Sequence, residues 1–303
     1  MLLLIRHALS AGRPRSLLWS AACAAMVLLL LVTRNASADA QESPRRILSI
    51  GGAITEIVFA LGEEGRLVGR DSTSTWPEEA RELPDVGYMR ALAPEGVLSI
   101  RPDLILASEG SGPPEAIDVL KAASIPYVEV PQEYDAEGID AAIRIVSEAL
   151  GVREKGDALR ADLSEQITEL SVAVAEIKQR KRVLFILSMQ DGRIMASGTG
   201  TAADGILRLA GAENALTEFA GYKQLTDEAL ISADPDVVLM MDRGDGFTID
   251  DEALFSHPGL KSTRAGRNRA FVRMDGLYLL GFGPRTAAAA LDLAKALYGN
   301  DLR

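Results

Sequence analysis

The sequence predicts an α/β protein with two Rossmann-like lobes, each built on a central parallel sheet, joined by one long α-helix. Three observations indicate this fold class. Short, continuously apolar strands alternate with helices, one long amphipathic stretch interrupts the alternation, and a pattern before this stretch recurs after it. Continuous apolar strands are typical of parallel sheets that helices cover on both faces.

The first forty residues have the pattern of an export signal. Arg6, Arg13 and Arg15 supply a basic start, residues 17–32 form an apolar run, and small residues follow at 36–40. The run is shorter than the roughly 20 residues that a membrane-spanning helix needs. We therefore expect a signal peptide over residues 1–40 and an exported protein, with an uncleaved membrane anchor as the alternative.

The remaining 263 residues are acidic and poor in metal-binding side chains. They hold 28 basic and 42 acidic residues, a net charge of −14, and the one cysteine, Cys23, is lost with the signal. This charge disfavours nucleic acid or an anionic membrane surface as a partner. His257 is their single histidine, which argues against zinc or copper sites and against catalytic triads unless it is the base. Because it precedes a proline in "FSHPGL", we expect His257 in a surface turn.

The first lobe is expected over residues 45–152. An apolar strand at 46–50 ends in a glycine pair, and a helix follows with Thr55 near its start and Gly62 as its stop. Two further strands, at 102–108 and 125–130, flank a helix at 113–124. This order of strands and helices indicates a parallel sheet.

A single long helix is predicted at 153–180. Its apolar side chains are spaced by four, four, three, four and three residues, at Leu159, Leu163, Ile167, Leu170, Val174 and Ile177. That spacing produces one apolar stripe. A helix of roughly 24 residues is about 36 Å long, so this helix is suited to join two lobes as a rigid spine.

The second lobe is expected over residues 181–303, with strands at 183–189, 235–241 and 269–274. Its segment "DEALISADPDVVL" (227–239) aligns without a gap with "PEGVLSIRPDLIL" (94–106) of the first lobe. Glu95 and Glu228 occupy the same place in the two segments. Acids are favoured in any first helical turn, but the shared register indicates a duplicated plan in which each lobe presents one glutamate.

Six segments carry a resemblance to a known family. They are "ILSIGGAITEIVFALG", "VGRDSTSTWPEEA", "LPDVGYMRALAPEGVLSIRPDLIL", "ASGTGTAADGILRLAGAENAL", "GYKQLTDEALISADPDVVLMM" and "MDGLYLLGFGPRTAAAALDLA". In order and spacing they resemble the helical-backbone periplasmic binding proteins of ABC importers, and most of all the haem-binding proteins of haem importers. The resemblance covers nearly the whole chain after the signal.

The resemblance implies a transport protein and not an enzyme. Haem is the implied transported ligand, bound in a cleft between the lobes, with no catalytic cofactor and with iron acquisition as the purpose. The implied partners are an outer-membrane receptor that supplies the haem and an inner-membrane permease, with its ATPase, that receives it from a monomeric binder. By position, Glu95 and Glu228 match the glutamates with which the related vitamin B12 binder contacts permease arginines.

This chain departs from the family at Trp76. Many haem-binding members have a tyrosine before this proline, and its phenolate binds the iron. An indole has an N–H donor and no available lone pair, so Trp76 cannot coordinate iron. We expect Trp76 to form a flat wall against a planar macrocycle, and the alternative is a tryptophan buried against its own lobe. Tyr88 and Tyr222 are the candidate phenolates, and Tyr222 is the expected axial ligand because it would face Trp76 across the cleft. A site without iron coordination is the alternative.

The other candidate cleft residues lie in strand-end loops or at helix starts, where such folds bind ligands. They are Tyr88 and Met89; the arginines Arg70, Arg90, Arg243 and Arg285, as partners of haem propionates; and Ser197 and Gly198, at a helix N-terminus able to hold a carboxylate. Each arginine is equally well explained as a solvated surface residue, and Met89 as core filling.

Two other functions stay open. The same fold can bind a corrinoid or a ferric siderophore, which need aromatic walls and no axial phenolate, and Trp76 favours this option. An exported α/β hydrolase or oxidoreductase is the other alternative, and it requires a convergent acid–base pair. The shortage of histidine and cysteine argues against it.

Overall fold

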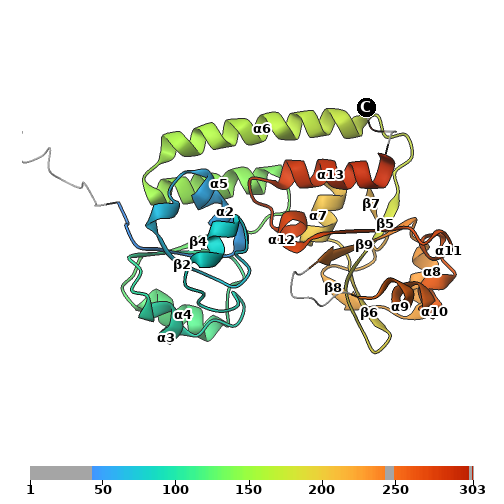
Figure 1. The fold of residues 1–303 in the computed structure, drawn as a ribbon, viewed down its shortest axis with the longest axis horizontal. Helices are drawn as coiled ribbons and strands as arrows, with labels where there is room; N and C mark the ends of the chain where they lie inside the picture. Colours follow the sequence, from blue (N-terminus) through green and yellow to red (C-terminus); the bar gives the residue numbers. More distant parts are fainter. Residues whose placement is uncertain (1–42, 243–248, 300–301, 303) are drawn as a thin grey trace, which may run out of the picture. The chain divides into compact units, whose positions relative to one another are not determined.

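Two β-sheets, connected in sequence by one long helix, organise the chain (Figure 1). The computed structural model describes residues 43–242, 249–299 and 302, and Pro44–Arg303 is one structural unit. The predicted signal peptide and Arg243 lie outside the described residues. Within these ranges, no helix has both the length and the apolar character required to cross a bilayer.

The first sheet is entirely parallel, with strand order β2-β1-β3-β4. Its strands are β1 (Ile47–Ile50), β2 (Leu67–Arg70), β3 (Leu104–Ser108) and β4 (Tyr127–Val130). Its helices are α2 (Gly52–Ala60), α3 (Pro94–Ser99), α4 (Pro114–Ala122) and α5 (Ala136–Leu150), with short 3-10 helices at Glu64–Arg66 and Glu78–Glu82. Every residue of β1 and β3 is buried, which explains their continuous apolar sequence.

The second sheet has the order β10-β9-β5-β6-β8, and β7 also pairs with β5. Its strands are β5 (Arg182–Gln190), β6 (Arg193–Ser197), β7 (Glu213–Asn214), β8 (Tyr222–Gln224), β9 (Val237–Asp242) and β10 (Phe271–Asp275). Its strands β10, β9 and β5 are parallel, as expected, but β6 runs antiparallel to β5 and to β8, so this sheet is mixed. Asp191 and Gly192 connect β5 to β6 with φ of 50° and 71°, and an Asp-Gly pair with positive φ is the signal of a two-residue hairpin.

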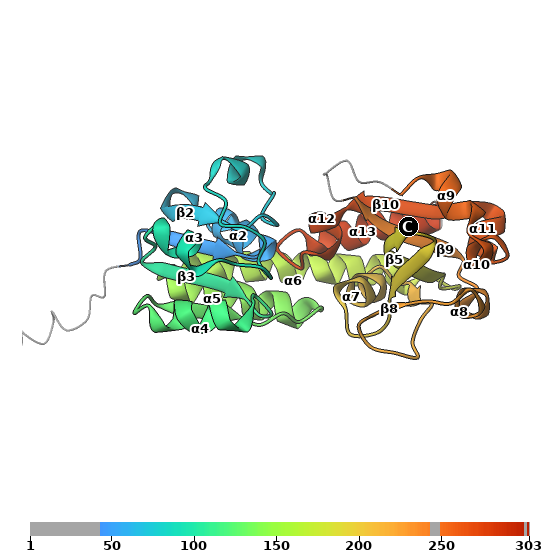
Figure 2. The ribbon, with the colours of Figure 1, turned by 90° about the horizontal axis from the view of Figure 1, so that it is seen from below.

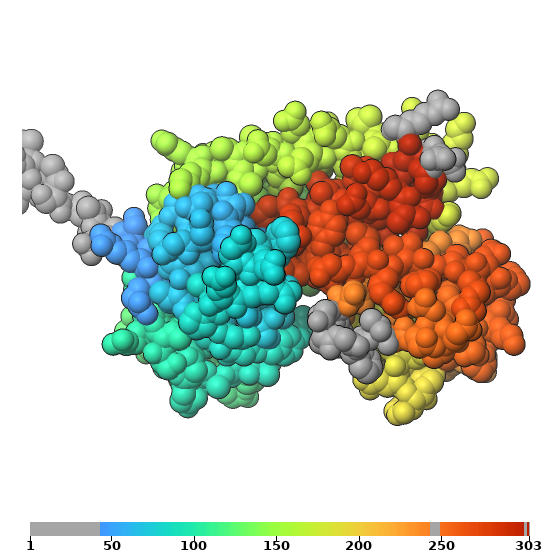
Figure 3. Space-filling view, viewed as in Figure 1, coloured from blue at the N-terminus to red at the C-terminus, as the bar shows by residue number. Residues whose placement is uncertain are grey.

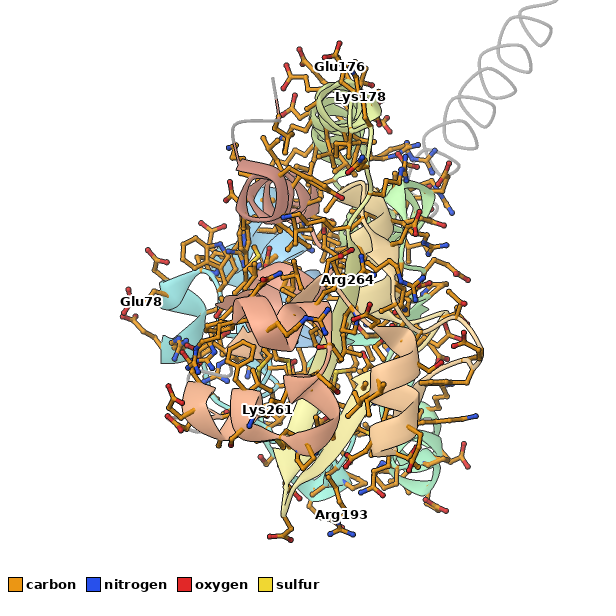
Figure 4. The ribbon with its side chains drawn as sticks, turned by 90° about the vertical axis from the view of Figure 1, so that its right-hand side faces the viewer. Glu78, Glu176, Lys178, Arg193, Lys261 and Arg264 are labelled. Atoms are coloured by element: carbon orange, nitrogen blue, oxygen red, sulfur yellow. The ribbon has the colours of Figure 1, made fainter. Side chains whose placement is uncertain are left out.

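The spine helix begins at Arg153, as expected, and ends at Ala175, before the predicted end at 180; the helices of the second lobe follow it. Together they are α6 (Arg153–Ala175), α7 (Ala202–Leu209), α8 (Asp227–Ala233), α9 (Asp251–Ser256), α10 (Pro258–Lys261), α11 (Arg264–Asn268), α12 (Gly276–Leu280) and α13 (Thr286–Tyr298). Helix α6 contacts α5 of the first lobe and α13 of the second, and Figures 1 and 2 show it passing along both. Leu163 and Leu170 of its apolar stripe are buried. Seen from the second-lobe end, Arg193 at the hairpin and Glu176 beyond α6 lie at opposite extremes (Figure 4).

The core joins the two lobes. The largest apolar cluster contains Ile54 of α2, Leu163 of α6 and Leu293 of α13, so it continues from the first lobe to the second. Two smaller clusters lie within single lobes, one around Leu48 and one around Leu184. A core that is shared in this way resists independent motion of the lobes, because separating them would expose apolar surface.

The repeat in the sequence is also a repeat in the structure. In each lobe a residue with left-handed φ stands between a short helix and a proline: Arg101, with φ of 50°, precedes Pro102, and Asp234, with φ of 36°, precedes Pro235. The aspartate after each proline then accepts a backbone hydrogen bond at the start of another strand. Asp103 accepts from the Arg46 N–H at 2.9 Å, and Asp236 accepts from the Arg182 N–H at 2.9 Å. The same left-handed residue, proline and hydrogen-bonded aspartate therefore follow α3 and α8, the helices that carry Glu95 and Glu228.

Candidate functional site

A buried carboxylate builds the loop that carries Trp76. Asp71 is fully buried. One of its oxygens accepts from the Gly51 N–H at 2.8 Å and from the Ser74 hydroxyl at 2.7 Å. The other accepts from the Thr73 N–H at 2.9 Å and from the Thr73 hydroxyl at 2.6 Å. Two of the small hydroxylated residues before Trp76 therefore hold the loop to the end of β1, and their hydroxyls are not offered to a ligand.

Arg70 stabilises the same loop from its other side. Its guanidinium donates to the carbonyl oxygens of Ala80 and Asp71, at 3.1 and 3.0 Å, and to the carboxylate of Asp85, at 2.9 Å. Only 11% of its side chain is exposed. Arg70 therefore holds the loop closed. These contacts do not support the expectation that Arg70 faces a ligand carboxylate.

Trp76 is half-exposed and contacts a residue of the second lobe. Its side chain retains 47% exposure, so it is not buried against its own lobe. The guanidinium carbon of Arg285 lies 4.4 Å from the centre of the indole ring. The same guanidinium carbon also lies 5.0 Å from the ring centre of Tyr278. One part of the indole thus rests on Arg285 while the rest remains accessible.

Arg285 is ion-paired with a buried carboxylate of the first lobe. Its Nε and Nη2 donate to the two oxygens of Glu56 in α2, at 2.9 and 2.6 Å. Burial raises the pKa of Glu56 and outweighs the hydrogen bonds and charge of Arg285, which lower it, while the charge of Asp275 raises it further. Arg285 therefore already holds a carboxylate of the protein, whereas the sequence predicted that it would hold one of the ligand.

Arg90 interacts electrostatically with two tyrosines, Tyr134 and Tyr222. Burial raises the pKa of Tyr222, the hydrogen bond with Thr201 and the charge of Arg90 lower it, and Tyr134 adds to the rise. The hydroxyl of Tyr222 thus lies among protein groups although 39% of the residue is exposed. The charge of Arg90, in the first lobe, therefore acts on the hydroxyl of Tyr222, in the second.

Tyr134 and its neighbour Phe282 are residues that the sequence analysis missed. Their rings meet edge to face with centroids 5.3 Å apart. Tyr134 lies in the loop between β4 and α5, and Phe282 follows α12 in the second lobe. The position of Tyr134 directly after a predicted strand was the available signal, because strand-end loops carry ligand contacts in such folds.

The remaining candidates divide into exposed and structural residues. Tyr88 is 48% exposed, whereas Met89 is only 8% exposed and lies in the apolar cluster of the first lobe. Ser197 is fully buried, and its hydroxyl pairs with that of Thr201 at 2.5 Å. The Gly198 N–H donates to a carbonyl of the neighbouring loop at 2.8 Å. Met89, Ser197 and Gly198 therefore serve the fold, and the carboxylate site expected at the last two is not formed by them.

Glu95 and Glu228 are exposed residues in the first turns of α3 and α8. Hydrogen bonds from its own backbone N–H and from the Thr226 side chain lower the pKa of Glu228. Equivalent placement on two lobes of one unit means that both acids keep a constant separation as long as the lobes do not move. Such a pair can dictate the orientation of a docked partner.

The prediction for His257 is wrong. The residue is 8% exposed and caps α10, where its Nδ1 accepts the Gly259 N–H at 3.2 Å. Its Nε2 lies 2.8 Å from the carbonyl oxygen of Gly192 at the β5–β6 hairpin. With both ring nitrogens paired to backbone, His257 is a structural residue. Among the described residues, no group of three or more His, Cys, Asp or Glu is arranged to hold a metal ion.

Comparison with known proteins agrees with this geometry. The chain is 44% identical to the solved periplasmic haem-binding protein BhuT, in complex with two haems, with a TM-score of 0.79 over 83% of this chain and 97% of that one. It is 27% identical to an ABC transporter substrate-binding lipoprotein, YvrC, of Bacillus subtilis, over 87% of this chain and 83% of the relative. It is also 27% identical to the vitamin B12-binding protein of Pectobacterium atrosepticum, over 65% of this chain and 71% of the relative.

The family model described as periplasmic binding protein matches residues 47–277. This match includes both sheets, the spine helix and the loops that carry Trp76, Tyr88, Arg90 and Tyr222, and it ends before Arg285. This chain belongs to the periplasmic binding protein family.

Proposed function

We propose that this chain binds haem between its two lobes and delivers it to the permease of an ABC importer. The observation that carries the proposal is the 44% identity to a haem-binding protein over 97% of that chain. The B12-binding relative is less similar, at 27% identity over a smaller share of each chain. Haem is the transported ligand in this proposal, and the protein performs no chemistry on it.

Exposed aromatic and basic residues of the two lobes suit a flat, apolar ligand with acidic edges. Trp76, Tyr88 and Tyr222 are large aromatic side chains with 47%, 48% and 39% exposure. Aromatic rings stack favourably on planar π-systems. Arg90 is exposed, and its charge acts on Tyr222, so it is the arginine that we propose as the partner of a haem propionate. Figure 3 shows the lobes in contact beneath α6 and α13 and parting further from these helices.

Tyr222 is the proposed axial ligand of the iron. Trp76 cannot coordinate the metal, because its indole offers a donor and no lone pair. Burial raises the pKa of Tyr222, so the free protein holds this phenol in its neutral form. Iron must therefore displace the phenolic proton, and this binding mode is expected to strengthen as pH rises.

Hemin titration of the purified protein tests the proposal. We expect a shifted Soret band and a phenolate-to-iron charge-transfer band that is lost in Tyr222→Phe and kept in the matched control Tyr88→Phe. If no Soret change occurs with hemin at any ratio, haem is not the ligand. A charge-transfer band that survives in Tyr222→Phe removes this tyrosine as the iron ligand.

A corrinoid is the second candidate ligand, favoured by one observation. The position where many haem binders of the family carry the iron-binding tyrosine holds Trp76 here, and a corrinoid needs a wall but no axial phenolate. Competition between hemin and cyanocobalamin, followed by the fluorescence of Trp76, separates the two candidates. Cobalamin that binds alone and displaces hemin would support this second candidate.

The cellular setting is part of the same proposal. Residues 1–40 act as the signal for export, an outer-membrane receptor supplies the haem, and the protein works as a monomer. Glu95 and Glu228 dock it on the permease, one on each lobe. Their exposure in equivalent first helical turns supports this role. Mass analysis of the exported protein tests the cleavage, and light scattering tests the monomer.

A further inference from the structure

We propose that Arg285 is a positioning residue, which latches the two lobes together and supports the indole of Trp76 as a wall of the binding site. In this role it does not bind the ligand itself. Only the last step, in which the wall contacts ligand, rests on the proposed function. The latch consists of Glu56 and Trp76 from the first lobe and Tyr278 and Arg285 from the second.

The ion pair supplies the connection between the lobes. Glu56 and Arg285 are 229 positions apart, and two parallel hydrogen bonds of 2.6 and 2.9 Å join them. The Glu56 side chain is only 5% exposed, and that of Arg285 is 28% exposed. A carboxylate so far from water requires a charged partner. Removing either residue therefore leaves the other in an unfavourable place at the lobe junction.

The guanidinium also serves as a platform. It lies 4.4 Å from the ring centre of Trp76 and 5.0 Å from that of Tyr278. The hydroxyl of Tyr278 donates to Asp292 of α13 at 3.0 Å, which anchors this ring to the second lobe. A planar guanidinium can stack on aromatic faces while its N–H groups bind a carboxylate in the same plane. Trp76 thus stacks on the guanidinium of Arg285, which belongs to the second lobe and is hydrogen-bonded to Glu56 of the first.

The backbone around the latch is adapted to close approach. A Cβ atom on Gly283 would lie 3.4 Å from the Cα of Ala53 and 3.3 Å from Glu56 Oε2. A Cβ on Gly52 would lie only 2.4 Å from the Leu277 side chain. The neighbouring cavity, lined by Tyr134 and Phe282, measures ≈ 20 Å³, about the room for one water. Helix α2 and the segment after α12 therefore meet with almost no free space.

It follows that the orientation of Trp76 depends on the lobe it does not belong to. A change in the angle between the lobes would move Arg285, and the indole would lose its support. Lysine in place of Arg285 keeps the charge but offers no plane and no second parallel hydrogen bond. Arg285→Lys therefore tests the contribution of the planar guanidinium separately from that of its charge.

The test uses Trp76 as the reporter in the ligand-free protein. Trp19→Phe is introduced throughout, which leaves Trp76 as the single tryptophan of the chain. For Arg285→Lys and Glu56→Gln we expect a red-shifted emission and a rise of about twofold in acrylamide quenching. The matched control is Arg264→Lys, which alters an ion pair with Asp234 and Asp236 inside the second lobe, and it should leave both readings unchanged.

The outcomes distinguish the latch from the proposed function. If Trp76 responds in both variants but the wild-type protein ignores hemin, the latch stands and the haem proposal falls. If neither variant alters Trp76, the latch is refuted. If Arg285→Lys loses hemin binding while Trp76 is unaffected, Arg285 contacts the ligand directly, which also refutes a positioning role. Glu56→Gln is nearly isosteric, so it decides the matter should Arg285→Lys not fold.

Discussion

For Trp76, the exposure expected from the sequence agrees with the exposure found in the structure. Its position between hydroxylated residues and a proline predicted an exposed aromatic, and the side chain is 47% exposed. The sequence did not predict what lies behind the ring, because Arg285 is more than two hundred positions away. Pairings at such separation leave no local periodicity or motif, and only the folded chain shows them.

Replacement of Trp76 measures what the wall contributes to binding. Trp76→Ala should weaken hemin binding by about three- to tenfold, since an aromatic stacking contact contributes roughly 0.5–1.5 kcal/mol. Trp76→Phe, which keeps a ring, should retain most of the affinity. Absorption titration at fixed pH measures both. Equal affinity of the alanine variant and the wild type would show that the indole does not touch the ligand.

Glu56 makes the stability depend on pH in a defined direction. Its pKa is raised in the folded chain, so the folded state binds the proton more tightly than the unfolded state. Its contribution to stability is therefore fully present below the ordinary value of 4.5 and is lost as pH rises through the raised pKa. Burial raises the pKa of Glu56 most. Arg285 lowers this pKa, and the charge of Asp275 raises it.

Urea unfolding between about pH 4 and 7 checks this prediction. The free energy of unfolding of the wild type, minus that of Glu56→Gln, should fall as pH rises through this window. Glutamine cannot titrate, so the difference isolates the ionisation of Glu56 from that of other carboxylates. A difference that is constant or that rises with pH would contradict the raised pKa.

At the scale of elements, buried parallel strands were the most predictable feature. β1, β3 and β9 occur where continuous apolar runs predicted them, because strands covered on both faces need no polar positions. β6 and β8 were missed, although the Asp-Gly pair at 191–192 is a hairpin signal. His257 was misplaced because its partner carbonyl, in that same hairpin, is 65 residues away.

The Trp76 loop is an element held by one residue, and Asp71→Asn should loosen it. Asp71 accepts four hydrogen bonds while fully buried. An amide places a donor against the Thr73 N–H, so at least one donor loses its acceptor, at about 1–3 kcal/mol. We expect that loss in the free energy of unfolding, measured in urea, and none for the control Asp118→Asn on the exposed face of α4. Unchanged stability in Asp71→Asn would mean that the network is not needed for the loop.

At the scale of the whole molecule, the shared apolar cluster and the Glu56–Arg285 ion pair act together. The cluster runs through α5, α6 and α13 on one side of the lobe junction, and the ion pair closes the junction near Trp76. The spine helix was predictable from its stripe of apolar residues. The stiffness of the junction was not, since it depends on contacts between residues from opposite ends of the sequence.

The proposed docking role of Glu95 and Glu228 requires that the two lobes keep the acids at a fixed separation. A single exposed ion pair contributes only about 0–1 kcal/mol, so Glu95→Ala or Glu228→Ala alone should weaken binding to the permease–ATPase complex by no more than about fivefold. The double variant should lose both contributions, because a rigid body presents the two acids at once, and the loss should shrink at high salt. Hemin affinity should stay unchanged in all three variants. Glu115→Ala, also in a first helical turn of the first lobe, is the matched control. Should Glu115→Ala weaken docking as much as the double variant does, the effect would come from overall negative charge, and the two equivalent positions would have no special role.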